Sequence, residues 1–304
     1  MLIDAHAHIY EELRGYGPRG EFRALGGGKG IWATGEVAPF FPAEYGDKGF
    51  LAEALLQIMD ENGVDHAVLL QGGNYGFHNE YTAEAARNYP ARFTPVGTVD
   101  PYARYAEQIM DHLVNDLRVH ALKFEISQSW GMSGYHPGLR LDNEQFAPLL
   151  KKADDLGMTV TLDIGGLGDS SYNLDAVRNI VKRYPNITFV MTHCFFPCPD
   201  GHNDERLGYM QELVSDRFYF DFANLPPCVS PEKYPFVTQQ DFLREAKKRV
   251  GADHLIWGTD LPGILMNYTY RELTDYVTES DVFTPEELKL VMAENAVRVY
   301  HIDL

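Results

Sequence analysis

The sequence predicts an α/β fold of the (β/α)8 TIM-barrel type, because eight strand-like segments alternate with helical ones. Several strand-like segments are near-continuous apolar runs, as expected where a parallel sheet is buried on both faces. The rival is a doubly wound sheet, which usually has a glycine-rich turn after its first strand, but none follows His8. The predicted strands are residues 2–8, 66–71, 93–99, 121–126, 159–164, 188–193, 218–222 and 255–259.

Helical periodicity follows each predicted strand. In the first predicted helix, apolar residues such as Leu55 and Met59 share one stripe, and Gly63 follows as a left-handed stop. The last predicted helix is preceded by Thr284, with Glu287 three residues later, which is the pattern of a capping box. The predicted helices are residues 50–62, 79–88, 102–115, 142–156, 174–184, 206–215, 241–250, 269–278 and 285–299.

A long segment, residues 11–49, interrupts the alternation of strands and helices between the first strand and the first helix. Segments of this length without regular structure are often lids or binding loops, and in a barrel this one would cover the catalytic mouth. The alternative is a surface decoration or a contact in a homo-oligomer. Because no linker separates two halves, we expect one domain spanning residues 1–304, with residues 11–49 as an insertion that forms a lid.

The composition narrows the range of partners. A formal net charge of -18 argues against nucleic acid or an anionic membrane surface as a main partner. Neither a signal peptide nor an apolar run long enough to span a membrane is visible. The three cysteines, an odd and low count, give no disulfide framework and fit a reducing compartment. We therefore expect a cytoplasmic protein that acts on a small molecule.

Polar side chains recur where the predicted strands end. His6 and His8 are separated by one small residue, so a strand directs both imidazoles to one face. Neutral imidazole is a common ligand of zinc, manganese and iron. Asp163, His193 and Asp260 stand at the ends of three other predicted strands, where barrels build their active sites. We expect these side chains to converge.

Three short motifs resemble those of a known family. They are I-D-x-H-x-H at residues 3–8, T-H at residues 192–193 and G-T-D at residues 258–260. Together they are similar to the amidohydrolase superfamily, and most similar to its amidohydrolase-2 branch. That branch includes aminocarboxymuconate semialdehyde decarboxylase and related hydrolases, lactonases and hydratases. The resemblance spans almost the whole chain and is specific for the superfamily rather than for one reaction.

The resemblance implies a role for four of these residues. His6 and His8 would be metal ligands from the first strand. Asp260 would bind the metal and act as the catalytic base toward a water molecule. His193 would be a ligand or a catalytic acid. The implied cofactor is a divalent metal, zinc or manganese, which lowers the pKa of bound water to about 7.

Asp163 departs from the family pattern, since members usually have a histidine at the end of strand five. A carboxylate there predicts a fourth metal ligand and favours manganese or zinc. Two alternatives stay open. Asp163 could form a hydrogen bond with the substrate, or metal could be dispensable, as the resemblance implies for some lactonases of this branch.

Further residues are candidates for substrate binding. Lys123 shares a strand face with Glu125, so it could bind a substrate carboxylate, pair with Asp163, or form an internal Lys–Glu pair. Arg23 in the long segment could clamp a carboxylate, although solvated arginines are the ordinary case. The aromatic side chains after the fourth strand that could form an apolar wall are Trp130 and Tyr135.

These observations favour a metal-dependent hydrolase in which activated water attacks a carbonyl group. The expected substrate is a small carboxylated cyclic or aromatic-derived lactone or amide. A nonoxidative aromatic acid decarboxylase is the alternative, although its branch usually has the strand-five histidine, and a hydratase is a further one. A barrel that binds a ligand without catalysis belongs to a different class, and metal analysis would distinguish it.

Overall fold

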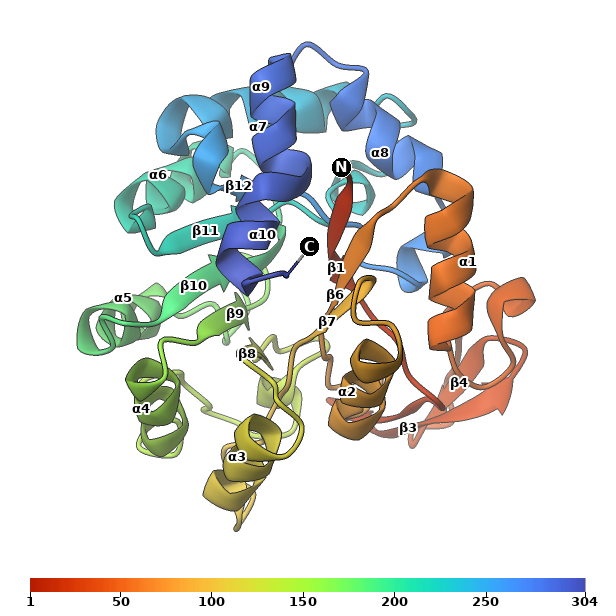
Figure 1. Cartoon of the computed structure of the whole chain (residues 1–304), viewed down its shortest axis with the longest axis vertical. Helices are drawn as coiled ribbons and strands as arrows, with labels where there is room; N and C mark the ends of the chain where they lie inside the picture. The colour runs from red at the N-terminus through yellow and green to blue at the C-terminus, as the bar shows by residue number, and fades with distance from the viewer. Residues whose placement is uncertain (304) are drawn as a thin grey trace.

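A computed structural model describes residues 1–303, and within them eight parallel strands surround a common axis (Figure 1). Each of the eight falls inside a segment predicted from the sequence. The strands are β1 (Ile3–Ala7), β6 (His66–Leu69), β7 (Phe93–Pro95), β8 (Ala121–Glu125), β9 (Thr159–Asp163), β10 (Thr188–Met191), β11 (Phe218–Asp221) and β12 (Leu255–Ile256).

Backbone hydrogen bonds close these strands into a barrel in sequence order. Parallel ladders join β1 to β6 and β7, and join β8 through β12. The N–H of Lys123 donates to the carbonyl of Gly97 at 2.8 Å, which joins the β7 side to β8. The N–H of Ala5 donates to the carbonyl of Trp257 at 3.2 Å, which joins β12 to β1. The predicted TIM barrel is therefore confirmed.

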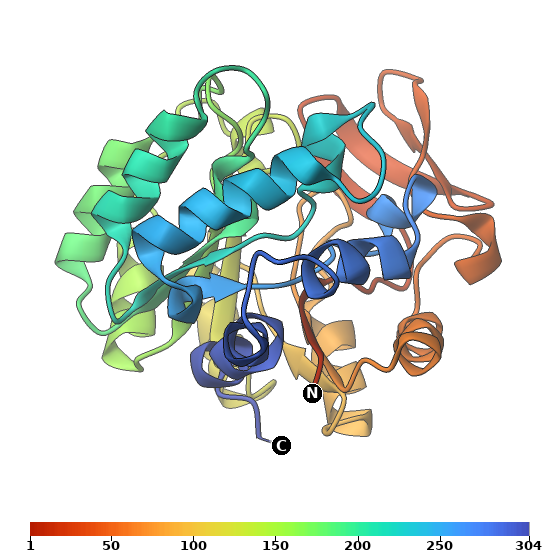
Figure 2. The ribbon, with the colours of Figure 1, turned by 90° about the horizontal axis from the view of Figure 1, so that it is seen from above.

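Helices pack around the outside of the barrel (Figures 1 and 2). Helix α2 has the predicted bounds, whereas α4 begins five residues later than predicted. Pro148 explains the late start of α4, because proline lacks an N–H and is tolerated only in the first turn. The outer helices are α1 (Ala52–Asn62), α2 (Asn79–Asn88), α3 (Ala106–Asn115), α4 (Ala147–Asp155), α5 (Leu174–Arg183), α6 (Asn203–Leu213), α7 (Val237–Val250) and α8 (Tyr270–Thr278).

The last predicted helix is divided into three parts and lies across one end of the barrel. They are α9 (Pro285–Lys289), a π-helical turn (Leu290–Glu294) and α10 (Asn295–Tyr300). The capping box of Thr284 and Glu287 is present. The hydroxyl groups of Tyr300 and Thr161 lie 2.9 Å apart, so α10 contacts the middle of β9. This end is closed, and the carboxyl ends of the strands face the other way.

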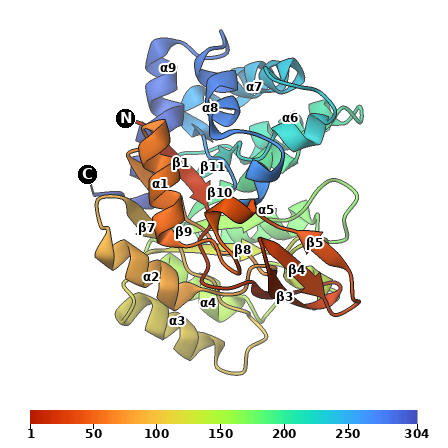
Figure 3. The ribbon, with the colours of Figure 1, turned by 90° about the vertical axis from the view of Figure 1, so that its right-hand side faces the viewer.

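The segment predicted as a long loop contains a small sheet. Residues 14–39 of the described chain form four antiparallel strands in the order β2-β3-β4-β5. Figure 2 shows this sheet at the end of the barrel opposite both chain termini, and Figure 3 shows it from the side. Its strands are β2 (Arg14–Gly17), β3 (Gly20–Gly26), β4 (Lys29–Trp32) and β5 (Val37–Pro39).

Alternation of buried and exposed residues explains the sheet. Along β3, Phe22 and Ala24 are buried while Arg23 between them is exposed. The function of residues 11–49 as a lid stays a prediction.

Short 3-10 turns complete the structure. They are η1 (Ala43–Tyr45), η2 (Met132–Gly134), η3 (Thr192–Phe195), η4 (Pro226–Val229), η5 (Ala252–His254) and η6 (Gly263–Met266). Among the described residues, no helix combines the length and apolar composition that crossing a membrane requires.

Candidate active site

His6 and His8 are both buried at the carboxyl end of β1, and a hydrogen bond at Nδ1 fixes the orientation of each ring. The Nδ1 atom of His6 donates to the carboxylate of Asp221 at 2.8 Å, and that of His8 donates to the carbonyl of Leu70 at 3.0 Å. Burial lowers the pKa of both imidazoles, that of His6 most strongly, so both are neutral near pH 7. With Nδ1 protonated, each ring presents an unprotonated Nε2 atom.

The carboxylate of Asp260 meets these two nitrogens. Its Oδ1 atom lies 3.0 Å from Nε2 of His8 and 3.5 Å from Nε2 of His6, and Asn224 donates to its Oδ2 atom at 2.8 Å. Burial opposes ionisation of Asp260, whereas the positive charge of His193 lowers its pKa. Two nitrogen lone pairs and an anionic oxygen therefore point at one another.

This arrangement fits a divalent metal. Ligand atoms of His6, His8 and Asp260 all lie within 4.8 Å of one another. Nitrogen and carboxylate oxygen donors suit zinc and manganese. Hydrogen bonds from the far nitrogen of each histidine are the support that metal-binding histidines usually have. Without a cation, the two unprotonated Nε2 atoms face the carboxylate oxygen of Asp260, and all three atoms are hydrogen-bond acceptors. A cation bound among them would interact favourably with each of the three.

Asp163 does not join this group of three in the described chain, contrary to the prediction of a fourth ligand. Its Oδ2 atom instead lies 3.5 Å from Nε2 of His193. Burial alone would lower the pKa of His193, but Asp163, Asp221 and Asp260 together raise it to about 9. His193 and Lys123 in turn lower the pKa of Asp163 to about 2, although its burial acts in the opposite direction. The two side chains form an ion pair at neutral pH.

A strained turn holds His193 in this position. His193, Cys194, Phe195 and Phe196 all have positive φ, between 45° and 63°. Residues other than glycine rarely adopt this conformation, and such strain persists only where the surroundings impose it. The N–H of His193 donates to Asp221 at 3.0 Å, and its Nδ1 atom donates to the carbonyl of Ala223 at 2.9 Å. The Nε2 atom is left to face the cavity and Asp163.

Lys123 and Glu125 project from β8 into the same space. The Nζ atom of Lys123 lies 3.4 Å from Nε2 of His6, and no carboxylate oxygen of residues 1–303 lies within 4.0 Å of it. The predicted ion pair with Asp163 and the internal Lys–Glu pair are therefore both absent from the described chain. Burial raises the pKa of Glu125 to about 7, with Lys123 acting in the opposite direction.

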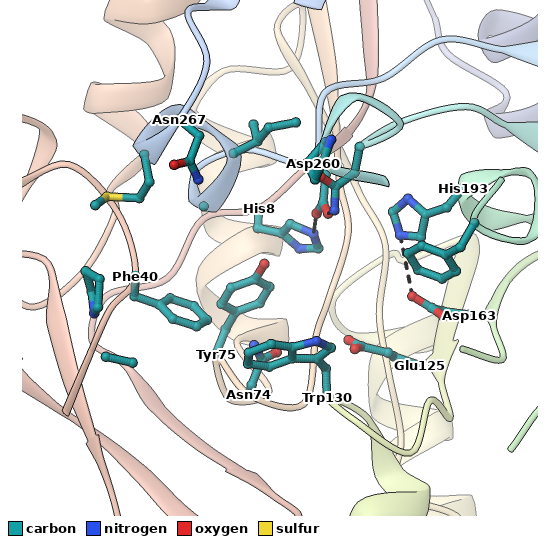
Figure 4. Close-up of a pocket in the computed structure, with 18 of the residues that line it drawn as sticks. His8, Phe40, Asn74, Tyr75, Glu125, Trp130, Asp163, His193, Asp260 and Asn267 are labelled. Carbon is teal, nitrogen blue, oxygen red and sulfur yellow. Dashed lines mark hydrogen bonds and ion pairs between the residues drawn. The ribbon is translucent and has the colours of Figure 1, made fainter. Parts of the chain in front are cut away.

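These side chains line a cavity of about 450 Å³, a suitable size for a small ligand. Figure 4 shows His193 and Asp163 on one side of it, with His8 and Asp260 adjacent. Trp130 lines the cavity, as predicted. Other lining residues are Ala38, Pro39, Phe40, Asn74, Tyr75, Lys123, Glu125, Phe196, Asn224, Pro227, Gly263, Ile264, Met266 and Asn267.

Two predicted substrate-binding residues are not among the lining residues of the described chain. Arg23 is exposed on β3, because the alternation of that strand buries its neighbours Phe22 and Ala24 instead. Tyr135 packs against Tyr16 and His136, with ring centroids 5.3 Å and 4.6 Å away. Neither side chain is therefore placed to contact a substrate in this cavity.

Four residues of the site were not predicted from the sequence: Asp221, Asn224, Tyr75 and Phe40. Asp221 ends the apolar run of β11, so the rule that selected Asp163 and Asp260 could have found it. Asn224 follows Asp221 closely and adopts a φ of 57°, which the sequence does not reveal. Tyr75 and Phe40 reach the cavity from a loop and from the insertion, and no local pattern indicates that.

A closed (β/α)8 barrel that brings histidine and aspartate side chains together at the carboxyl ends of its strands is an arrangement typical of barrel enzymes, whose active sites lie at that end. The sequence profile of the family described as Amidohydrolase, Amidohydro_2, matches residues 3–302, and the chain belongs to this family. No protein of curated function matches it in sequence.

Similar solved structures agree with this fold. An amidohydrolase from Burkholderia multivorans with bound zinc has a TM-score of 0.74, 16% identity and 100% coverage of both chains. A probable 2-pyrone-4,6-dicarboxylic acid hydrolase from Acinetobacter baumannii, with citric acid bound, has a TM-score of 0.69, 17% identity and 99% coverage of both. The 5-carboxyvanillate decarboxylase of Sphingomonas paucimobilis has a TM-score of 0.56, 16% identity and 82% coverage of both. At these identities the likeness is one of fold.

Proposed function

We propose that this protein is a metal-dependent hydrolase of a small carboxylated cyclic ester or amide. The observation that supports it most is the convergence of two unprotonated imidazole nitrogens and the Asp260 carboxylate at the edge of the cavity. A divalent metal held by His6, His8 and Asp260 would lower the pKa of a water molecule to about 7 and polarise the substrate carbonyl.

The protein groups supply an acid and a base with different proton affinities, as hydrolysis requires. Asp260, with a pKa of about 2, is ionised and accepts a proton from the attacking water. The oxygen of that water then bonds to the carbonyl carbon. His193, with a pKa of about 9, is protonated at neutral pH and gives its Nε2 proton to the leaving oxygen or nitrogen. Asp163 holds the imidazolium in place.

Product analysis tests this reaction. Purified protein loaded with zinc or manganese is incubated with a panel of lactones, cyclic amides and aromatic acids, and the products are identified by mass spectrometry. We expect ring opening with uptake of one water molecule. Release of carbon dioxide from an aromatic acid, without hydrolysis of any lactone or amide, would contradict the proposal and favour the decarboxylase.

The Asp260→Asn variant tests the assigned base. We expect it to lose turnover by about a thousandfold or more while its circular dichroism spectrum stays native, because loss of the base removes the proton transfer and weakens metal binding. Asp216→Asn is the matched control, since Asp216 is exposed and precedes β11 at the closed end of the barrel. Normal turnover by Asp260→Asn would refute the role.

A further inference from the structure

Two of the three cysteines lie together beside the cavity, although they come from different loops. Cys198 follows the turn after β10, and Cys228 is in η4, which follows β11. The thiol of Cys228 donates a hydrogen bond to the sulfur of Cys198. Both side chains are partly exposed, whereas Cys194 is fully buried. The fold therefore places one pair of thiols in contact with each other and within reach of solvent.

A buried glutamine side chain holds the two loops together. The Nε2 atom of Gln239 in α7 donates to the carbonyl of Pro197 at 3.0 Å and to that of Leu225 at 2.9 Å. Pro197 directly precedes Cys198, and Leu225 directly precedes the turn that contains Cys228. Hydrogen bonds that are buried away from water are costly to break. The approach of the two thiols is thus imposed by the backbone on both sides.

The surroundings of Cys198 favour its thiolate. The hydrogen bond from Cys228 and the nearby guanidinium of Arg206 lower the pKa of the Cys198 thiol to about 7, although burial and the carboxylate of Asp200 act in the opposite direction. The same hydrogen bond and burial raise the pKa of the Cys228 thiol well above its ordinary value. Because the thiolate is the nucleophilic form of cysteine, Cys198 is the reactive member of the pair, and Cys228 beside it keeps its proton.

Each thiol also contacts the backbone of a residue that lines the cavity. The Sγ atom of Cys198 lies 3.3 Å from the carbonyl oxygen of Phe196, and that of Cys228 lies 3.9 Å from the carbonyl oxygen of Asn224. Phe196 and Asn224 both line the cavity, and Asn224 donates to the carboxylate of Asp260 at 2.8 Å. A covalent bond between the two sulfur atoms would therefore restrain the two segments that carry these cavity residues.

We propose that Cys198 and Cys228 form a reversible disulfide when the protein is exposed to a hydroperoxide, and that this bond restrains the two loops beside the cavity. The inference goes beyond the proposed function and does not depend on it. Disulfides of this transient, redox-sensing kind occur in compartments that keep structural cysteines reduced.

The reaction with hydrogen peroxide has two steps. The Cys198 thiolate attacks one oxygen of the peroxide, the O–O bond breaks, and a sulfenic acid and a hydroxide ion form. The Sγ atom of Cys228 then bonds to that of Cys198, the S–O bond breaks, and the hydroxyl group leaves as water with the proton of Cys228. The two sulfur atoms together lose two electrons, which the peroxide gains. A dithiol such as dithiothreitol reverses the change by thiol–disulfide exchange.

Peptide mapping tests the pairing. The folded protein is treated briefly with hydrogen peroxide, unfolded in urea with N-ethylmaleimide to block free thiols, and digested with trypsin. Residues 184–206 should be released joined to residues 218–233, with the loss of two hydrogen atoms, and dithiothreitol should separate them. Fragment spectra should place the link at Cys198 and the maleimide at Cys194. A link through Cys194, a link between two chains, or no link would overturn the inference.

Serine variants separate the two steps. In Cys228→Ser the sulfenic acid has no resolving thiol, so dimedone should label Cys198 at least about tenfold more than in the wild type. In Cys198→Ser, Cys228 should react with peroxide at least about tenfold more slowly than Cys198 does in Cys228→Ser. Cys194 is the internal control and should stay unlabelled in both folded variants. Equal labelling of Cys198 with and without Cys228, or faster reaction at Cys228, would overturn the assigned roles.

Hydrogen exchange measures the effect on the loops. Backbone amides of residues 193–203 and 222–230 should exchange at least about threefold more slowly in the oxidised wild type, and dithiothreitol should restore the original rates. The same treatment should leave Cys198→Ser unchanged. Unchanged exchange of both segments in fully linked protein would overturn the proposed restraint. If a serine variant does not fold, as judged by circular dichroism, the wild-type mapping and exchange still decide the question. None of these measurements needs a substrate, so a failed hydrolysis assay would not affect them.

Discussion

At the scale of single residues, hydrogen bonding on the far side of each ring decides what the histidines can do. His6 and His8 each donate from Nδ1 and so present a lone pair, whereas His193 donates from Nδ1 and keeps a second proton because Asp163 faces its Nε2 atom. In the proposed function, the same residue type thus supplies two metal ligands and one acid. The residue types could be predicted from the sequence, but these protonation states depend on partners distant in the chain.

The dependence of His193 on Asp163 gives a first prediction. Burial lowers the pKa of an imidazole, and Asp163 is the main group that raises it here. In Asp163→Asn the pKa of His193 should therefore fall below its wild-type value of about 9, because only Asp221 and Asp260 then oppose the effect of burial. Nitrogen-15 NMR titration of the imidazoles measures this.

His112 is the internal control for that titration. Glu80 and Asp116 raise the pKa of His112, which is exposed and distant in sequence from the cavity residues. It should titrate identically in both proteins. If the His193 signal titrated at the same pH with and without the Asp163 carboxylate, the assignment of His193 as an acid poised by Asp163 would fail.

At the scale of elements, the contact between β1 and the segment after β12 explains why a glycine stands at residue 258. A Cβ atom added there would lie 2.6 Å from Cβ of His6 and 2.8 Å from its backbone nitrogen. The N–H of Asp260 donates to the carbonyl of His6 at 2.7 Å, so this close approach aligns Asp260 with His6 and His8. The G-T-D motif therefore has a packing requirement as well as a chemical one.

Gly258→Ala should destabilise the protein by about 1–3 kcal/mol, because the added methyl group must displace the backbone of β1. Gly208→Ala is the matched control, since an added Cβ at this position in α6 meets nothing within 4 Å and alanine favours helix by about 0.5–1 kcal/mol. Urea unfolding measures both. Equal stability of Gly258→Ala and wild type would contradict the close contact.

The turn after β10 is anchored by a charged pair on the outside of the barrel. Arg206 in α6 is almost fully buried, and it donates to the carbonyl of Phe195 at 3.2 Å and to both carboxylate oxygens of Asp200 at 2.7 Å and 2.6 Å. The guanidinium of Arg206 holds the pKa of Asp200 well below its ordinary value. This pair supports the strained turn that positions His193.

The lowered pKa gives stability a defined dependence on pH. The unfolded chain takes up the Asp200 proton first, so the contribution of the pair is present above about pH 4 and decreases as the pH falls further. Asp200→Asn should cost about 1 kcal/mol at pH 7, since Asp200 is partly exposed, and less at pH 3. Urea unfolding at the two pH values measures this, and Asp216→Asn should show no cost at either. An equal cost of Asp200→Asn at both values would contradict the assigned pair.

At the scale of the whole molecule, the barrel could be predicted because the order of its strands and helices follows from local sequence patterns. The eight apolar runs and the helical stripes between them each depend on neighbouring residues only. The convergence of His6, His8 and Asp260 could be predicted as well, since barrel topology brings the carboxyl ends of the strands together. The side chains that line the cavity could not all be predicted, because Phe40, Tyr75 and Asn224 reach it through loop conformations that no sequence periodicity indicates.

The insertion illustrates the same limit. Its glycines and aromatic residues suggested a loop, and alternation over four-residue strands such as β4 was too short to predict a sheet. A loop would allow Arg23 to reach the substrate, but the pleat of β3 turns this side chain to solvent. The orientation of a side chain on a short strand depends on register with its neighbours, which is a property of the assembled sheet.

Metal content tests the central claim most directly. The wild-type protein, incubated with zinc or manganese and then freed of unbound ion by gel filtration, should hold about one ion per chain by elemental mass spectrometry. His8→Ala and Asp260→Ala should hold less than about one tenth of that amount, because each variant loses one of the three converging donors. His120→Ala is the control, and it should hold as much metal as the wild type because His120 is exposed and lies outside the cavity. A wild-type protein that binds no ion, or folded variants that keep a full one, would contradict a metal centre built by His6, His8 and Asp260.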